Sequence, residues 1–228
     1  MKILFFTDTY FPQINGVSFV VRNHAKKLIE KGHDVEIFAP KSNEKKNEDI
    51  KVNYLDAVNF FFYPGYYVII PSLRNLKILK EISKKNFDVI HCHTPFSAGI
   101  FGIIIARILR KKRKKLLLVG TYHTILSEFV YVLPFPKRMR GIIGKIADYY
   151  SVIFYNLMDF VITPSEYTKN LLKSYGVKKP IFAISNGIDL NLFNNENKNK
   201  NSEKIKEKFN ADHLILHVGR ISKERNID

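Results

Sequence analysis

The sequence predicts an α/β fold with a Rossmann-like, doubly wound parallel sheet. Short apolar runs alternate with amphipathic segments of helical period, starting at the second residue. Polar residues follow several of these runs, at the carboxyl ends of the expected strands, where open parallel sheets bind ligands. The alternation continues through residues 1–185, which we predict to be one complete domain.

The N-terminal part shows the first strand–helix–strand repeat. Ser18 is the expected N-cap of the helix, and Gly32 is a suitable residue to end it. Residues 41–51 are polar and charged, as in a surface loop, whereas residues 52–71 are aromatic and irregular. The other elements expected here are a strand at Lys2–Phe6, a loop over 7–16, and a strand at 34–39 closed by Pro40.

The following elements continue the alternation. Gly176 marks the end of the last helix of the domain. The apolar face of the long helix at 138–157 is expected to pack mainly in the core. Helices are expected at 73–85, 96–109, 138–157 and Glu166–Tyr175, and strands at 88–93, 116–121, 159–163 and 180–185.

The C-terminal part differs in composition from this domain. Residues 186–213 are predicted to be an interdomain linker with a short helix at 202–209. Residues 214–228 are predicted to be the truncated start of a second domain, with one strand at 214–218. Because a lone strand cannot form a core, we interpret the chain as a fragment or as one module of a larger protein.

The charge of the chain is its main compositional anomaly. Lys and Arg number 37 against 21 Asp and Glu, a formal net charge of +16. This excess indicates either an anionic partner or a solvated, lysine-rich surface. The single cysteine, Cys92, excludes an internal disulfide and fits a reducing cytoplasm. The sequence contains neither a signal-peptide pattern nor an apolar run long enough to span a membrane.

The loop over 7–18 opens a helix directly after the first strand. Gly16 would let a ligand approach the backbone closely, and free N–H groups at a helix N-terminus can bind phosphate. The alternative is an ordinary turn glycine. The loop lacks the G-x-G-x-x-G pattern, so a dinucleotide-binding dehydrogenase is not indicated.

Histidines follow or end two of the predicted strands. His91 and His93 are two residues apart, so they share one face of a strand. No further ligand spacing completes a zinc site, so a structural or substrate-contacting role is favoured and no metal is expected. His123 follows the next strand, where its position favours a substrate contact. Arg220 and Arg225 follow the last expected strand and suit a diphosphate, unless they are surface charges of a frayed terminus.

Together these loops resemble the retaining glycosyltransferases of the GT-B type, in the family-4-like group that includes sucrose-, mannosyl- and glycolipid-forming enzymes. Each matching stretch is short, but all occur in the same order across nearly the whole chain. The loop that ends at Gly16 and residues 62–66 are most similar to enzymes that glycosylate diacylglycerol or phosphatidylinositol. The matching stretches are Asp8 to Ser18, HCHTPF at 91–96, TYHT at 121–124, NGID at 186–189 with Phe193, and GRISKERNID at 219–228.

The resemblance implies that residues 1–185 are the acceptor-binding half of a GT-B fold and face a second, Rossmann-like domain. It implies hexose transfer with retention of configuration from a nucleotide sugar, UDP-linked rather than GDP-linked, with no other cofactor and no metal. His123 would be the catalytic residue, in contact with the transferred sugar. Gly16, Arg220 and Arg225 would bind the donor, although the family usually has lysine in place of Arg225. Asp8, Tyr10, Asn15, His93 and Tyr122 would bind the acceptor.

The family's paired glutamates lie in its second domain, so we expect the 228-residue chain alone to have no useful transferase activity. The acceptor is expected to be a membrane lipid. The alternatives are a soluble sugar acceptor, and a non-catalytic basic module that binds a membrane surface or nucleic acid. Nucleic acid is not an expected partner, because no recognition motif accompanies the positive charge.

Two basic clusters suggest where a membrane could bind. One is the run from Arg110 to Lys115, and the other extends from Lys137 to Lys145 at the start of the long helix. Each basic residue near an anionic bilayer contributes about 1 kcal/mol. We therefore expect a cytoplasmic protein that binds peripherally at the inner membrane face. A solvated loop is the alternative for the first cluster.

Overall fold

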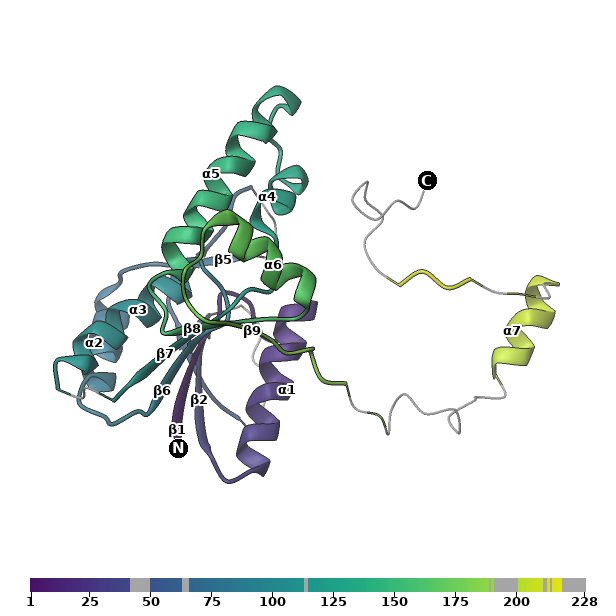
Figure 1. Ribbon diagram of the computed structural model, residues 1–228. Helices are drawn as coiled ribbons and strands as arrows, with labels where there is room; N and C mark the ends of the chain where they lie inside the picture. The colour runs from purple at the N-terminus through teal and green to yellow at the C-terminus, as the bar shows by residue number, and fades with distance from the viewer. Residues whose placement is uncertain are drawn as a thin grey trace. The chain divides into compact units, whose positions relative to one another are not determined.

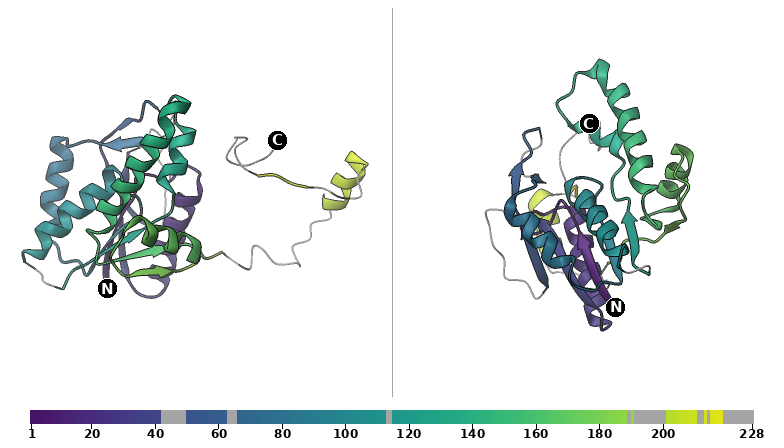
Figure 2. Two further views of the ribbon diagram at one scale, coloured as in Figure 1. Left: turned by 45° about the horizontal axis from the view of Figure 1, so that its top comes forward. Right: turned by 90° about the vertical axis from the view of Figure 1, so that its left-hand side faces the viewer.

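The computed structural model describes residues 1–41, 50–62, 66–112, 115–188, 190, 201–210, 213 and 215–218. The chain divides into two compact units, Met1–Asn186 and Gly187–Asp228. The first unit contains the sheet and the helices packed on it (Figures 1 and 2). The loops, histidines and cavity described below belong to this unit.

A seven-stranded sheet lies at the centre of the first unit, and its paired neighbours are all parallel. The central strands form because they are apolar runs that can be buried on both faces; residues 3–6 of β1 are all buried. The strand order is β3-β2-β1-β6-β7-β8-β9, so the winding direction reverses between β1 and β6. The strands are β1 (Lys2–Phe6), β2 (Asp34–Pro40), β3 (Lys51–Leu55), β6 (Val89–Cys92), β7 (Leu117–Thr121), β8 (Phe160–Thr163) and β9 (Ile181–Ala183).

Helices cover the two faces of the sheet unequally (Figure 1). Among the described residues, α1 packs on one face, where Val21 and Ala25 join a core cluster with Phe5 and Ile37. Helices α2, α3, α5 and α6 contribute to a separate and larger cluster on the opposite face. This arrangement confirms the predicted doubly wound α/β fold. The helices are α1 (Gly16–Glu30), α2 (Leu73–Ile82), α3 (Ser97–Arg110), α5 (Lys137–Tyr155) and α6 (Glu166–Tyr175).

The first helix begins earlier than the sequence predicted. Asn15, rather than Ser18, is its N-cap: the Asn15 side chain accepts a hydrogen bond from Ser18 N at 2.9 Å. The Ser18 hydroxyl accepts in return from Asn15 N at 3.1 Å. Ser18 therefore occupies the position that glutamate usually takes in a capping box. Gly32, with a φ of 81°, follows the end of the helix as predicted.

The aromatic segment predicted to be irregular contains three strands. β3 pairs with β2 at the edge of the sheet, and β4 (Ala57–Asn59) pairs with β5 (Tyr67–Ile69) as a separate antiparallel hairpin. Two further short elements were not predicted: α4 (Leu126–Phe129) and the 3-10 helix η1 (Val130–Val132), which precede α5. In Figures 1 and 2, α4 lies beside α5, and α5 extends well past the sheet.

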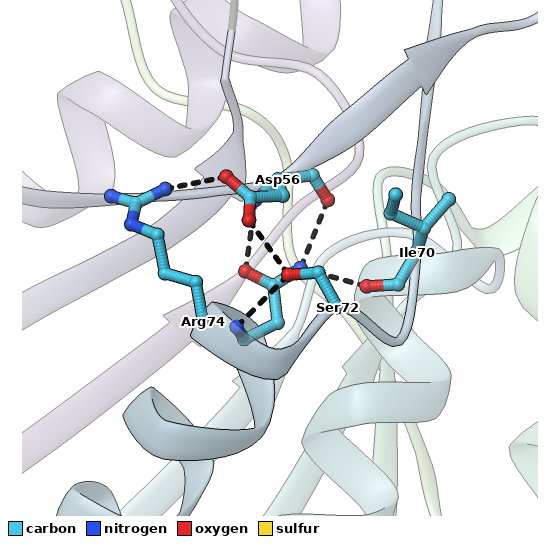
Figure 3. Close-up of polar contacts among 5 residues, drawn as sticks. Asp56, Ile70, Ser72 and Arg74 are labelled. Atoms are coloured by element: carbon cyan, nitrogen blue, oxygen red, sulfur yellow. Dashed lines mark hydrogen bonds and ion pairs between the residues drawn. The ribbon is translucent and has the colours of Figure 1, made fainter.

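Asp56 anchors the β4–β5 hairpin to α2 (Figure 3). Its carboxylate accepts a hydrogen bond from Ser72 Oγ at 2.6 Å and forms an ion pair with Arg74 at 2.7 Å. Asn75, which is buried, accepts from Asp56 N and donates to the carbonyl oxygens of Asp56 and Ile70. Both ends of the hairpin are therefore attached to the first turn of α2, which fixes its position next to α3.

Two glycines allow α3 to lie directly on β6. A Cβ atom at Gly99 would stand 2.2 Å from the Thr94 carbonyl oxygen, and one at Gly102 would stand 2.6 Å from Cys92 Sγ. Both separations are far below van der Waals contact, so only glycine fits without movement of the backbone or the core. The close approach places the N-terminus of α3 at the carboxyl end of β6.

In the second unit, α7 (Asn201–Phe209) confirms the helix predicted at 202–209. The strand predicted at 214–218 is wrong for the described residues 215–218, which lie outside any strand, and Ile215 is fully exposed. A strand needs a paired neighbour for its N–H and C=O groups, and none of the described residues pairs with this segment. Asp189, Phe193 and residues 219–228 lie outside the described residues.

Candidate functional site

The loop between β1 and α1 is held in place by its own polar side chains. Thr9 Oγ1 donates a hydrogen bond to Gln13 at 2.8 Å and accepts one from Asn15 Nδ2 at 2.5 Å. Gly16 is the exposed first residue of α1, and a Cβ atom there would meet no other atom within 4 Å. The fold itself therefore does not require glycine at this position. Its backbone N–H belongs to the class of helix N-terminal groups that bind phosphate.

Asp8 connects this loop to the N-terminus of α3. One carboxylate oxygen accepts hydrogen bonds from Ser97 Oγ and, at 2.8 Å, from Ala98 N, and the other accepts from Thr94 Oγ1 at 2.5 Å. Thr94 Oγ1 accepts in turn from Asp8 N at 2.8 Å. Burial raises the pKa of Asp8, although these hydrogen bonds oppose that rise. Asp8 thus joins the carboxyl ends of β1 and β6, in addition to any contact with an acceptor.

A cluster of histidines lies on the α1 side of the sheet, at the carboxyl ends of β6 and β7. The His91 and His93 rings stack with centroids 3.9 Å apart, which confirms that they share one face. His93 Nδ1 lies 3.3 Å from His123 Nε2, and the ring of His24, on α1, lies 6.1 Å from that of His93. His91 Nε2 is hydrogen-bonded to Thr121 Oγ1 at 2.7 Å. The structure therefore brings the predicted catalytic His123 together with the predicted acceptor residue His93.

These histidines are uncharged at neutral pH. Burial, with repulsion from the neighbouring imidazoles, lowers the pKa of His91 to about 3 and that of His123 to about 4. The same causes hold the pKa of His93 well below its usual value, and burial lowers the pKa of His24. A neutral imidazole has one N–H donor and one nitrogen acceptor, so it suits a sugar hydroxyl better than an anion.

The two tyrosines predicted to bind the acceptor lie in the core. Tyr10 is 3% exposed and packs edge-on against Phe11, and Tyr122 is 1% exposed and packs edge-on against Tyr155. Their burial favours a packing role, so their contact with an acceptor stays a prediction. The donor residues Arg220 and Arg225 lie outside the described residues, and their roles also stay predictions.

An apolar cavity of about 580 Å³ lies on the opposite side of the sheet, next to Asp8 and Ser97. Its walls come from the hairpin, α3, α4, η1 and α5. The cavity was not predicted from the sequence, because neither the hairpin nor α4 and η1 was predicted. The one signal was the aromatic character of the hairpin segment, from which Phe60, Tyr66 and Tyr67 supply part of the wall. The lining includes Tyr67, Ile100, Leu126, Val130, Ile143 and Ala147.

The outer surface of α5 carries a row of exposed apolar side chains beside this cavity. Ile142 and Ile146 are 65% and 61% exposed, whereas Phe154 is buried. The expectation that the apolar face of this helix packs in the core is therefore correct only in part. The reason is that α5 extends past the sheet, so its N-terminal portion has no sheet to pack against (Figure 1). The exposed row comprises Met139, Ile142, Ile146, Tyr149 and Ile153.

The two basic clusters are in part engaged in the fold. Arg110 pairs with Asp159 and donates to the Leu116 carbonyl, so its charge is largely committed within the protein. Arg113 and Lys114 lie outside the described residues. On α5, Arg140 donates to the Phe135 carbonyl at 3.0 Å. The side chains of these clusters that are exposed are Lys111, Lys112, Lys115, Lys137, Arg138 and Lys145.

In the part of the chain that the structure describes, no group of three or more His, Cys, Asp or Glu side chains is arranged to hold a metal ion. In the same residues, no helix combines the length and the apolar character needed to cross a membrane. Cys92 is buried, and burial raises the pKa of its thiol, so it is not a reactive nucleophile.

Comparison with known proteins gives relatives that match the whole of this chain. An alpha-monoglucosyldiacylglycerol synthase of Streptococcus pneumoniae is 34% identical, over 100% of this chain and 50% of the relative. A second alpha-monoglucosyldiacylglycerol synthase, from Acholeplasma laidlawii, is 26% identical over 100% of this chain and 57% of the relative. The chain thus spans about half the length of the curated relatives it matches. Among solved structures, the catalytic domain of starch synthase IV from Arabidopsis thaliana has a TM-score of 0.49 at 16% identity, over 85% of this chain and 53% of that one.

The model of one protein family also matches the chain. The match covers residues 14–192 and so includes the N-terminus of α1, the histidine cluster and the helices that line the apolar cavity. It extends over well more than half of the sequence. The chain therefore belongs to Glycosyltransferase Family 4.

Proposed function

We propose that this chain is the acceptor-side half of a retaining glycosyltransferase that moves a hexose from a nucleotide-diphosphate sugar to a membrane lipid. Family membership supports the reaction class. The names of the two relatives described above specify glucosyl transfer to a diacylglycerol lipid, which makes glucose and diacylglycerol the first pair to test. The observation that carries the choice of acceptor is the apolar cavity beside Asp8.

The lining of the cavity favours a lipid over a soluble sugar. Apart from Asp8, Ser97 and tyrosine hydroxyls, its walls are aliphatic and aromatic. A sugar bound there would lose hydrogen bonds to water without replacing them, which costs several kcal/mol, whereas an acyl chain would gain by leaving water. A volume of about 580 Å³ lies within the range of sites that enclose small molecules.

The surroundings of the cavity support a position at the membrane surface. The exposed apolar row of α5 adjoins the cavity, since Ile146 belongs to both. Near the other wall, Phe61 is 89% exposed. The ring centroid of Phe62 lies 6.2 Å from that of Phe135, which belongs to the segment that leads into α5. Proteins that bind peripherally to the surface of anionic bilayers typically present apolar side chains beside exposed lysines. A lipid acceptor would then reach the cavity without crossing water.

The donor is proposed to bind on the face of the sheet opposite the cavity, where α1 and the histidine cluster lie. The N-terminus of α1, at Gly16, would hold the diphosphate, and His123 would contact the transferred sugar. Arg220 and Arg225 would neutralise the charge that develops on the leaving diphosphate. We expect a UDP-sugar rather than a GDP-sugar as co-substrate, with no further cofactor. We also expect the 228-residue chain alone to show no useful transfer.

The acceptor proposal can be tested on this chain by equilibrium dialysis with a soluble, short-chain diacylglycerol. Saturable binding is expected, without competition from free glucose. The Ala147→Phe substitution should block it, because Ala147 lines the cavity and is only partly exposed. The control is Ile142→Phe, on the exposed row outside the cavity, which should bind normally. Equal binding by both variants, or no saturable binding by the unmodified chain, would contradict the proposal.

A further inference from the structure

His93 occupies an unusual place between two other histidines. It is 0% exposed, stacks on His91, and meets the ring of Phe5 edge-on with centroids 4.5 Å apart. Its Nδ1 atom has a polar neighbour, His123 Nε2 at 3.3 Å. Its Nε2 atom is buried and has no hydrogen-bond partner among the described residues. His93 is thus a fully buried imidazole that interacts through one nitrogen.

This geometry allows two arrangements of the shared proton. If His123 Nε2–H donates to His93 Nδ1, then the proton of neutral His93 must sit on Nε2, where it is a buried N–H without an acceptor. If His93 Nδ1–H donates to His123 Nε2, then Nε2 of His93 carries only a lone pair. Buried N–H groups without a partner are rarer in proteins than buried acceptors without one. The second arrangement is therefore favoured.

The favoured arrangement also determines the state of His123. Because His123 Nε2 accepts the hydrogen bond, the proton of the neutral His123 ring must lie on Nδ1. No hydrogen bond to His123 Nδ1 occurs within the part of the chain that the structure describes. That N–H is therefore available as a donor at the carboxyl end of β7, just after Thr121.

We propose that His93 is a positioning residue, which holds His123 in the Nδ1–H tautomer so that its Nδ1–H can donate to a hydroxyl oxygen of the transferred sugar. The substrate named here rests on the proposed function, whereas the tautomer does not. Neighbouring side chains support the arrangement: Thr121 fixes His91 at 2.7 Å, and the stacked His91 ring fixes the plane of His93. His24 also lies beside His93 and, with His91 and His123, is one of the described titratable groups that act on it. With the rings fixed in this way, neither ring alone can change its tautomer without breaking the shared hydrogen bond. A change of both would reverse that bond and leave a buried N–H of His93 without an acceptor.

The tautomers can be read from long-range ¹H–¹⁵N nuclear magnetic resonance spectra of the histidine rings, recorded on the 228-residue chain at pH 7. His93 and His123 should both appear as Nδ1–H forms, with unprotonated Nε2 atoms. This is opposite to free histidine peptides, in which the Nε2–H form predominates. An Nε2–H signal from His123 in the unmodified chain would overturn the proposal, whatever the variants show.

Two substitutions separate positioning from packing. His93→Leu fills the same buried space but has no donor, so His123 should lose its single tautomer and become a mixture. His93→Asn places an amide N–H near the position of Nδ1 and should restore the Nδ1–H form of His123. An unchanged His123 tautomer in a folded His93→Leu chain would contradict the proposal. No substrate enters this measurement, so a failure to find sugar transfer would count against the proposed function without affecting the assignment of the tautomer.

Discussion

The carboxylate of Asp8 accepts a hydrogen bond from Ala98 N at 2.8 Å, which joins the end of β1 to the first turn of α3. The same carboxylate accepts from the hydroxyls of Thr94 and Ser97. All of these partners donate hydrogen bonds to the carboxylate, so both side-chain oxygens of residue 8 must be acceptors. Asp8 also borders the apolar cavity, and the wall of the proposed lipid site therefore depends on these bonds.

Replacing Asp8 with Asn should destabilise the fold by about 2–3 kcal/mol, because an amide NH₂ would face a hydroxyl donor and leave a buried group without its partner. Urea unfolding monitored by circular dichroism would measure the loss. Asp34→Asn is the matched control: Asp34 is exposed at the start of β2, so the free energy of unfolding should change by less than about 0.5 kcal/mol. Equal stability of the Asp8 variant and the parent chain would show that the bonds contribute little.

A second prediction concerns the contact between α3 and the end of β6. Gly99→Ala would place a Cβ atom 2.2 Å from the Thr94 carbonyl and 2.7 Å from Phe154 Cζ. Because one of these atoms belongs to the backbone, relief requires a shift of α3, and a loss of about 3 kcal/mol or more is expected. Gly141→Ala in α5 is the control, since a Cβ atom there meets nothing within 4 Å. It should stabilise the helix by about 0.5–1 kcal/mol, and the same sign for both variants would contradict the packing argument.

The proposed membrane binding should depend on the exposed cations of α5. The triple substitution of Lys137, Arg138 and Lys145 by Glu should abolish co-sedimentation with anionic vesicles, because each cation contributes about 1 kcal/mol at such a surface. The matched control replaces three exposed lysines elsewhere with Glu: Lys26 in α1, Lys31 just after α1, and Lys173 in α6. This control should leave vesicle binding nearly unchanged. Binding that is equal for neutral and anionic vesicles, or absent for both, would argue against an electrostatic membrane contact.

The elements that the sequence predicted well are those with strong local signals. β1 is a short apolar run, and α6 ends at Gly176, whose φ of 109° is accessible mainly to glycine. The position of His91 and His93 on the same face followed from strand geometry alone, because side chains two residues apart in a strand point the same way. In each case neighbouring residues contain the information, so no knowledge of distant contacts was needed.

The parts that the sequence did not predict depend on tertiary contacts. β3 includes Lys51 and Asn53, which are poor strand formers, and both side chains bind Glu36 on the neighbouring strand. The hairpin is fixed by Asp56 and its partners on α2 (Figure 3), which are distant in sequence. Likewise, the apolar pattern of the α5 sequence does not indicate that Ile142 is exposed while Phe154 is buried. The cavity was missed for the same reason, because its walls come from elements that only the folded chain brings together.

The histidine cluster should make the protein sensitive to acid. A histidine whose pKa is lowered in the folded state binds fewer protons there than in the unfolded state, so stability decreases as the pH falls below the unfolded value of about 6.5. The loss continues until the pH approaches the folded pKa, which is about 4 for His123 and about 3 for His91. Asp8, whose pKa is raised, acts in the opposite direction at the acidic end of this window.

Each of these histidines should therefore steepen the pH dependence of the unfolding free energy by up to about 1.4 kcal/mol per pH unit between pH 6 and about 4.5. Urea titrations at a series of pH values would give the slope. His123→Asn removes one titrating group at a partly exposed position, so the slope should become shallower by about one histidine while the chain stays folded at pH 7. An unchanged slope in that variant would mean that His123 is protonated as readily in the folded chain as in the unfolded one. Its ring would then be a cation at mildly acidic pH rather than the neutral hydrogen-bond donor that the proposed sugar contact requires.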